Sequence, residues 1–295
     1  FTLIPNGEYS IEGDPRKVDF DTVELLANLG FNRMSVGVQD FASDVQEAVN
    51  RVQSYEETKL VVDAARVTGF KSVSMDLIYG LPRQNVISFN RTLEQVLEIS
   101  PDRISLYSYA HLPQLFKPQR RINSADMPTA DTKLQILQLA IRRLTEAGYV
   151  YIGMDHFALE SDALVEAQQK GELQRNFQGY STRGGVDICA LGMSSISQTH
   201  STYRQNEKDL KAYMRRIDEG ELPISGGYLL TEDDLIRRET IMRLMCDLQL
   251  DFVQLSERLD IDFTNYFKDA IAALQPMAED GLVDIFDDRL EVTAS

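Results

Sequence analysis

The chain has 295 residues, with 30 Lys and Arg against 46 Asp and Glu, so its formal net charge is −16. This acidity argues against nucleic acid or an anionic membrane surface as the main partner, because both need a basic footprint. No stretch approaches the roughly 20 apolar residues of a membrane span. Two cysteines, Cys189 and Cys246, are too few for a disulfide framework. We therefore expect a cytoplasmic protein, a monomer, with neither a nucleic-acid nor a membrane partner.

The first two hundred residues alternate between apolar runs typical of β-strands and longer amphipathic stretches typical of helices. Three of the helical stretches, 19–30, 54–69 and 130–148, end in a Gly followed by an aromatic residue. Gly favours the left-handed backbone that ends a helix. The recurring junction therefore predicts an α/β fold with parallel strands, either a TIM-like barrel or a doubly wound sheet, unless the three helix ends are unrelated. The predicted strands cover 8–14, 32–39, 71–80, 102–110, 149–158 and 188–197.

The character of the chain changes near LPISGGY (222–228), a Pro- and Gly-rich segment that predicts a linker. We expect a first domain over 1–225 and a mainly helical second domain over 226–295. Its helices and the hairpin-like stretch 282–294 are similar to a winged-helix module. The segment has no basic recognition helix, so the pattern favours a docking or lid role over DNA binding.

Polar residues recur where the predicted strands end. In parallel βα folds the side chains at the carboxyl ends of strands line the site. A buried carboxylate needs a partner or a ligand, because leaving it unpaired is costly. The alternative is that each of these residues caps a following helix or turn. The set comprises Glu12, Asp14, Gln39, Asp40, Asp76, Tyr109, Ala110, His111, Asp155, His156, Ser194 and Ser195.

Carboxylates and amides at such a site can accept hydrogen bonds from ribose hydroxyls, an amino group or an adenine amine. The chain has neither a GxGxxG nor a GxxxxGK[ST] phosphate loop, so a nucleoside without phosphate fits better than NAD or ATP. The histidines, His111, His156 and His200, are too dispersed for a zinc site, and we predict no metal ligand in this chain.

Two loops carry local positive charge in this acidic chain. One has Lys117, Arg120 and Arg121, and the other has Arg175 and Arg183. Because Arg pairs bidentately with carboxylates, these loops could bind an acidic substrate. The alternative is that they are solvated loops with ordinary surface arginines.

Several segments that follow one another in order now identify a family. Together they closely resemble bacterial oxygen-independent coproporphyrinogen III oxidase, a radical S-adenosylmethionine (SAM) enzyme of haem synthesis. The resemblance runs from about Tyr9 to the end of the chain. The segments are SIEGDPR (10–16), GFNRMSVGVQDF (30–41), VNR (49–51), MDLIYGLP (75–82), YSYAHLP (107–113), GMDHFA (153–158), NFQGY (176–180) and LGMSSIS (191–197).

The resemblance implies a partial radical SAM (β/α) barrel of the TIM-like type, followed by a small helical, winged-helix-like domain. It also implies an oxidoreductase that uses two SAM molecules, a 4Fe–4S cluster and an electron donor. In the family, a 5′-deoxyadenosyl radical removes a hydrogen from a substrate propionate, and loss of CO2 and one electron leaves a vinyl group. Two such events convert coproporphyrinogen III to protoporphyrinogen IX.

Matching the motifs residue by residue implies six SAM contacts. Glu12 and Ile196 would contact the SAM that binds the cluster. The second SAM would be surrounded by Gln39, Arg51, Asp76 and Ala110. Arg51, expected on a helix, would bind the SAM carboxylate, and the acidic residues would accept from ribose hydroxyls or the amino group. Ala110 and Ile196 can contribute only backbone groups and packing. Catalytic residues are not assigned.

One departure from the family is serious, because its CxxxCxxC cluster motif is absent here. Aligning the motifs places the start of the chain after the family's first two barrel strands, so we expect the cluster ligands upstream of Phe1. The isolated chain should then be inactive and bind SAM weakly or not at all. It should also expose an unpaired strand edge near 8–14.

Two other functions compete with the oxidase. A haem chaperone of the same radical SAM group would carry HNxxYW where this chain reads RNFQGYS, and the chain has no Trp. A non-catalytic protein that binds a partner through its helical C-terminal segment is the third possibility. The motifs favour the oxidase.

Overall fold

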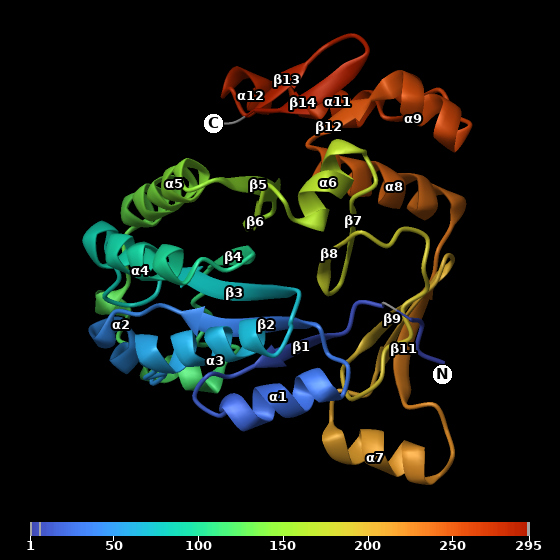
Figure 1. Ribbon diagram of the computed structural model, residues 1–295. Coiled ribbons are helices and arrows are strands. Elements are labelled where there is room, and N and C mark those ends of the chain that lie inside the picture. The colour runs from blue at the N-terminus through green and yellow to red at the C-terminus, as the bar shows by residue number, and fades with distance from the viewer. Residues whose placement is uncertain (1, 6, 294–295) are drawn as a thin grey trace. The chain divides into compact units, whose positions relative to one another are not determined.

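The computed structural model describes residues 2–5 and 7–293 (Figure 1). The chain forms two compact units, Phe1–Val165 and Glu166–Ser295. Each unit is described separately below. No helix in the described residues is both long enough and apolar enough to cross a membrane.

The first unit is built on a six-stranded sheet with the order β1-β2-β3-β4-β6-β5. Strands β1 (Ser10–Gly13), β2 (Arg33–Gln39), β3 (Ser72–Tyr79) and β4 (Arg103–Ser108) are parallel neighbours, which confirms four of the predicted strands. Within the described residues β1 pairs only with β2, so the predicted open edge at this strand is also confirmed.

The predicted strand 149–158 is wrong, because this segment forms a hairpin of β5 (Tyr149–Gly153) and β6 (His156–Leu159). Strand β6 is antiparallel to both β4 and β5. Met154 and Asp155 form the turn with φ values of 42° and 65°, the left-handed backbone that a two-residue hairpin turn requires. Asp155 therefore lies at a hairpin tip rather than at the carboxyl end of a parallel strand.

The predicted helices of the first unit are confirmed. At all three junctions the glycine has a left-handed φ, 97° at Gly30, 92° at Gly69 and 89° at Gly148. The capping box of Ser54 and Glu57 is also present. The helices are α1 (Phe20–Asn28), α2 (Ser43–Ala48), α3 (Tyr55–Val67), α4 (Val86–Ile99) and α5 (Ala130–Glu146), and short 3-10 helices cover Lys117–Arg121 and Ser124–Asp126.

The two faces of this sheet differ in chemistry. Side chains alternate along each strand, and paired residues of neighbouring strands share a face. One face is apolar and packs on α1, α3, α4 and α5, and it includes Met34, Val36, Met75, Leu77, Ile104 and Leu106. The opposite face carries Glu12, Ser35, Gly37, Ser74, Asp76 and Ser105. Because the helices cover the apolar face, the polar face is the one left for a ligand.

The second unit contains an antiparallel sheet in the order β11-β10-β9, formed by β9 (Ile196–Gln198), β10 (Thr202–Asn206) and β11 (Ile224–Leu229). The predicted parallel strand 188–197 is therefore wrong, since only its end enters a strand. The expected linker 222–228 is also wrong, because β11 occupies most of it, and Gly226 and Gly227 lie in the strand. Other elements here are α6 (Ala163–Gln169), which contains the boundary between the units, β7 (Gln174–Asn176), β8 (Gly179–Ser181) and α7 (Leu210–Asp218).

The last part of the second unit is helical with a small sheet in the order β12-β14-β13. The expected helical character and the expected terminal hairpin are both present, and Thr231 caps the first helix of this part. The division at 225/226 stays a prediction. The elements are α8 (Glu232–Asp247), β12 (Gln249–Asp251), α9 (Phe252–Leu259), α10 (Phe263–Tyr266), α11 (Lys268–Ala273), α12 (Gln275–Glu279), β13 (Val283–Ile285) and β14 (Arg289–Val292).

Candidate binding site on the polar face of the sheet

Two carboxylates, Glu12 on β1 and Asp76 on β3, share the polar face. Burial raises the pKa of Asp76, hydrogen bonds with Ser105 and Ser35 oppose that rise, and the nearby charge of Glu12 adds to it. The Ser35 hydroxyl lies 3.4 Å from Asp76 Oδ2. Asp76 therefore lies in surroundings that disfavour its negative charge, and hydroxyl or ammonium donors from a ligand would stabilise its ionised form.

Gln39 and Arg51 approach each other over Gly37 on β2. The pairing of β2 with β3 shifts between Gly37 and Gln39, and Gln39 has a left-handed φ of 67°. Arg51 lies in the loop between α2 and α3, which corrects the expected helical position. Its Nη2 donates to the Gly37 carbonyl at 3.0 Å. A Cβ at Gly37 would lie 2.9 Å from Gln39 Nε2 and 3.2 Å from Arg51 Nη2, so the absence of a side chain makes room for both.

The carboxylate of Asp14 pairs with two arginines, Arg16 and Arg51. Arg16 donates to Asp14 from Nε at 2.9 Å and from Nη2 at 2.6 Å, and this pairing is the main cause that lowers the pKa of Asp14 to about 2. Arg51 Nη2 lies 3.8 Å from the same carboxylate. The Nε atom of Arg51 is buried and has no hydrogen-bond partner in the described part of the chain. Arg51 is thus oriented and keeps a donor for a further acceptor.

These residues fit an amino acid joined to a nucleoside, which is the chemistry of SAM. Arg51 offers an unused donor for a carboxylate, while Glu12 and Asp76 offer acceptors for ribose hydroxyls and an ammonium group. The described residues offer no comparable site for a 4Fe–4S cluster. Residues 2–5 and 7–293 contain no group of three or more His, Cys, Asp or Glu side chains that could hold a metal.

The remaining two expected SAM contacts lie in different units. Ala110 follows β4, and its carbonyl accepts from Gln119 Nε2 at 3.0 Å, so the backbone of this residue is already held in place. Ile196 opens β9 in the second unit. Its grouping with Glu12 stays a prediction.

Other residues from the strand-end set have structural roles. Asp40 is only 1% exposed, and its Oδ1 accepts from Ala42 N and from Thr92 Oγ1, both at 2.7 Å. It therefore ties the end of β2 to α2 and α4, as the capping alternative predicts. Ser194 and Ser195 precede β9 in the second unit and do not lie at the end of a parallel strand.

The histidines and the first basic loop are also placed by the structure. His156 pairs in register with Ser105, which puts it on the polar face, and its ring meets Tyr107 edge-on at 5.9 Å. His111 lies 6.1 Å from the ring of Tyr109. In the basic loop, Arg120 Nε donates to the carbonyl of Pro113 at 2.9 Å, so Arg120 stabilises its own loop.

The sequence prediction missed Ser35, Gly37, Ser105, Asp14's ion pairs and the bulge at Gln39. Ser35, Gly37 and Ser105 occupy alternate positions in otherwise apolar strands. That period of two was visible in the sequence and could have indicated a polar sheet face. The bulge has no comparable signal.

Comparison with known proteins identifies the family. The chain is 45% identical over 294 residues to "Oxygen-independent coproporphyrinogen III oxidase" of Thermostichus vulcanus, covering 99% of this chain and 90% of that relative. The chain belongs to this family. It is also 48% identical over 290 residues to the protein of the same name from Pseudomonas aeruginosa, which covers 98% of this chain but only 63% of that relative.

Structure and family matches agree with this assignment. The solved coproporphyrinogen III oxidase of Escherichia coli, described as a radical SAM enzyme, has a TM-score of 0.95 and 46% identity, covering 98% of this chain and 67% of that one. Residues 3–96 match the Radical SAM superfamily, and residues 230–295 match the HemN C-terminal domain. The radical SAM family implies SAM and a 4Fe–4S cluster. The expected fold, a TIM-like radical SAM architecture with a further C-terminal domain, is confirmed.

Proposed function

We propose that the protein takes part in the oxygen-independent oxidation of coproporphyrinogen III to protoporphyrinogen IX. The observation that carries this proposal is the arrangement of Asp76, Gln39 and Arg51 around Gly37 on the polar face. The oxidase activity named for the relatives supports it, although the chain spans about 63% of the length of the Pseudomonas aeruginosa protein.

The chain's own residues bind and orient SAM in this proposal. When bound, SAM with a reduced cluster would supply the chemistry for abstraction of one hydrogen atom from the β-carbon of a propionate, and loss of CO2 with transfer of one electron to an acceptor would leave a vinyl group. Arg51 holds the SAM carboxylate with its unused Nε donor. Asp76 accepts hydrogen bonds from hydroxyl or ammonium groups of the same SAM, and Gln39 contributes its amide beside it. Glu12 accepts such hydrogen bonds from another SAM molecule.

The finer parts of the proposal concern the whole protein. Two SAM molecules bind, one contacted by Glu12 and Ile196 and the second by Gln39, Arg51, Asp76 and Ala110. The cluster ligands lie upstream of Phe1, so the 295-residue chain alone is inactive. The complete protein is a cytoplasmic monomer that receives electrons from a separate donor and decarboxylates two propionates of each substrate molecule.

The test uses the complete gene product, reconstituted anaerobically with iron and sulfide and supplied with reductant, SAM and coproporphyrinogen III. Protoporphyrin, after oxidation, and 5′-deoxyadenosine are measured by chromatography. Asp76→Ala should abolish both products. Asp63→Ala is the matched control, because Asp63 pairs with Lys59 on α3 and should leave turnover unchanged. SAM cleavage without any vinyl product would refute the proposed reaction and direct the next assay to haem binding.

A further inference from the structure

The second unit contains a cavity of about 530 Å³, which we call the arginine cavity. Its walls come from the β7–β8 hairpin, the β9–β10–β11 sheet and one side of α8. All of these elements belong to the same compact unit. The lining residues that matter for its chemistry are Arg175, Phe177, Tyr203, Tyr228, Arg238 and Ile241.

Two arginines in this cavity lack a carboxylate partner among the described residues. Arg175 stacks its guanidinium 4.7 Å from the centre of the Tyr180 ring, and its buried Nη1 has no hydrogen-bond partner within residues 2–5 and 7–293. Arg238 donates to two backbone carbonyls, those of Thr199 at 3.4 Å and His200 at 2.9 Å. Arg237 and Asp234 also line the cavity; Arg237 pairs with Asp233 at 2.7 Å, and Asp234 accepts hydrogen bonds from Thr231 and Tyr228. Three arginines against one carboxylate in the lining favour an anionic ligand.

The same cavity presents aromatic and aliphatic surface. Phe177 is 57% exposed, Tyr228 is 55% exposed and Ile241 is 54% exposed. The rings of Phe177 and Tyr203 meet edge-on at 5.4 Å. Exposed apolar side chains beside uncompensated arginines suit a ligand with a flat apolar body and carboxylate substituents.

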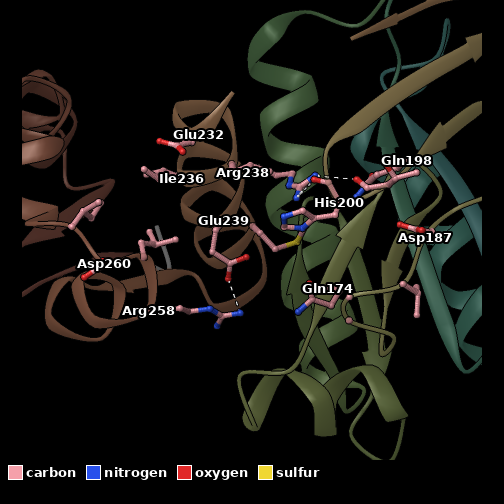
Figure 2. A pocket seen from close by; sticks show the side chains of 18 residues that line it. Gln174, Asp187, Gln198, His200, Glu232, Ile236, Arg238, Glu239, Arg258 and Asp260 are labelled. Carbon is pink, nitrogen blue, oxygen red and sulfur yellow. Dashed lines mark hydrogen bonds and ion pairs between the residues drawn. The ribbon is translucent and has the colours of Figure 1, made fainter. Parts of the chain in front are cut away.

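A larger neighbouring cavity of about 850 Å³ shares Gln198, Arg238 and Met242 with the arginine cavity but has the opposite charge. Figure 2 shows Arg258 directed at Glu239, and the two form an ion pair of 2.9 Å. Apart from that ion pair, the lining of the larger cavity has three carboxylates and one arginine, Arg238, so its net negative charge disfavours a polyanion. The three are Asp187, Glu232 and Asp260.

We propose that the arginine cavity binds a tetrapyrrole through its carboxylate side chains, with Arg175 and Arg238 each pairing with a propionate. The macrocycle would pack on Phe177, Tyr228 and Ile241. The proposal deepens the proposed function, on which it rests, because a substrate with four propionates needs cationic partners, whereas at the polar face Arg51 is assigned to SAM and Arg33 and Arg103 are paired with Glu8 and Asp162. Of the two arginines in the second basic loop, Arg175 lines the arginine cavity and Arg183 does not. The proposal therefore assigns a ligand contact to Arg175 alone of the two.

The experiment measures porphyrin binding by the 295-residue chain without SAM or cluster, using fluorescence titration. The probes are coproporphyrin III with four carboxylates, protoporphyrin IX with two, and coproporphyrin tetramethyl ester with none. We expect coproporphyrin to bind, the ester to bind at least about tenfold more weakly, and Arg175→Gln and Arg238→Gln each to weaken coproporphyrin binding about tenfold. Arg183→Gln and Arg258→Gln are matched controls that should bind as the unchanged chain does.

Each outcome decides a separate question. Protoporphyrin binding that also depends on both arginines supports a cavity that accepts substrate and product, whereas protoporphyrin binding far below that of coproporphyrin supports a substrate site. Equal affinity for coproporphyrin and its ester, or no effect of either arginine variant, overturns the proposal. Thermal unfolding of each variant shows whether it folds, and Arg175→Lys should restore part of the affinity if charge is what matters.

The result is distinguishable from a test of the proposed function, since no turnover is involved. If porphyrin binding depends on the two arginines but the complete gene product makes no vinyl product, the proposed binding site stands and the proposed oxidation reaction is refuted. If Arg175→Gln and Arg238→Gln change neither kcat nor KM of the complete gene product, the proposed substrate binding in the arginine cavity is refuted while the proposed reaction stands.

Discussion

Replacing Gly37 by Ala should weaken SAM binding while leaving the fold intact. The new Cβ would lie 2.9 Å from Gln39 Nε2 and 3.2 Å from Arg51 Nη2, both closer than ordinary van der Waals contact. Both contacted atoms are the ends of flexible side chains, so the strain is relieved when those side chains move. Gln39 Nε2 must move by about 0.5 Å, and Arg51 must lengthen or lose its 3.0 Å hydrogen bond to the Gly37 carbonyl.

The structure sets the size of the two effects. Losing the Arg51 hydrogen bond costs about 1 kcal/mol of folding free energy. Gly→Ala gives back about 0.4–1 kcal/mol by restricting the unfolded chain, because the φ of Gly37 is not in the left-handed region. The free energy of unfolding should therefore change by less than about 1 kcal/mol. Misplacing two ligand contacts should lower SAM affinity by about tenfold or more, equivalent to about 1.4 kcal/mol.

The matched control is Gly13→Ala on the neighbouring strand β1. A Cβ there would lie 3.6 Å from Val18 Cγ2 and 4.0 Å from the Ser35 carbonyl oxygen, which is ordinary contact. SAM binding to the complete gene product is measured by calorimetry, and stability is measured by denaturant unfolding. Unchanged SAM affinity in Gly37→Ala would refute the placement of the ligand over Gly37. A large loss of stability would refute the claim that only flexible side-chain ends must move.

Three further predictions concern charge and capping. Burial raises the pKa of Asp76, so the folded state binds the carboxyl proton of Asp76 more tightly than the unfolded state does. The contribution of Asp76 to the free energy of unfolding therefore falls as pH rises above 3.8, its ordinary pKa, and Asp76→Asn should flatten that slope when unfolding is measured against pH. The pKa of Asp14 is lowered to about 2, so its contribution to the free energy of unfolding is present above pH 3.8 and is lost as pH falls toward 2. If the stability of Asp14→Asn fell as steeply with acid as that of the unchanged chain, this prediction would be wrong. Ser54→Ala removes the capping box with Glu57 and should lower the free energy of unfolding by about 1 kcal/mol, measured against the exposed-site change Val67→Ala in the same helix.

Much of the first unit could be predicted from local signals. The three helix ends followed from a Gly before an aromatic residue, since only Gly reaches φ near 90° without strain. The parallel order of β1 to β4 followed from the βα alternation. The hairpin of β5 and β6 could not be predicted in this way, because Met154 and Asp155 form its turn without a Gly. The sheet of β9, β10 and β11 is fixed by contacts far apart in the sequence, so its short strands carry little local pattern.

The candidate site was predicted in part for a similar reason. Glu12 and Asp76 could be singled out because a carboxylate in an apolar run needs a partner. Asp40 satisfied the same rule and yet has a structural role, because it accepts hydrogen bonds from Ala42 N at the start of α2, from Thr92 on α4 and from Gln84 before α4. Sequence pattern therefore identifies buried charge, but only the pairing register shows which face of the sheet it lies on.

Arg51 shows how this site depends on more than the strands that carry its carboxylates. Its loop lies between α2 and α3, outside the sheet, and its side chain is positioned by the Gly37 carbonyl and the Asp14 carboxylate. Asp14 is in turn kept ionised by Arg16. A single bulge at Gln39 and a residue without a side chain at position 37 bring these elements together. The cationic half of the site is thus built from two arginines outside the sheet that converge on Asp14, while its anionic half is built into the strands themselves.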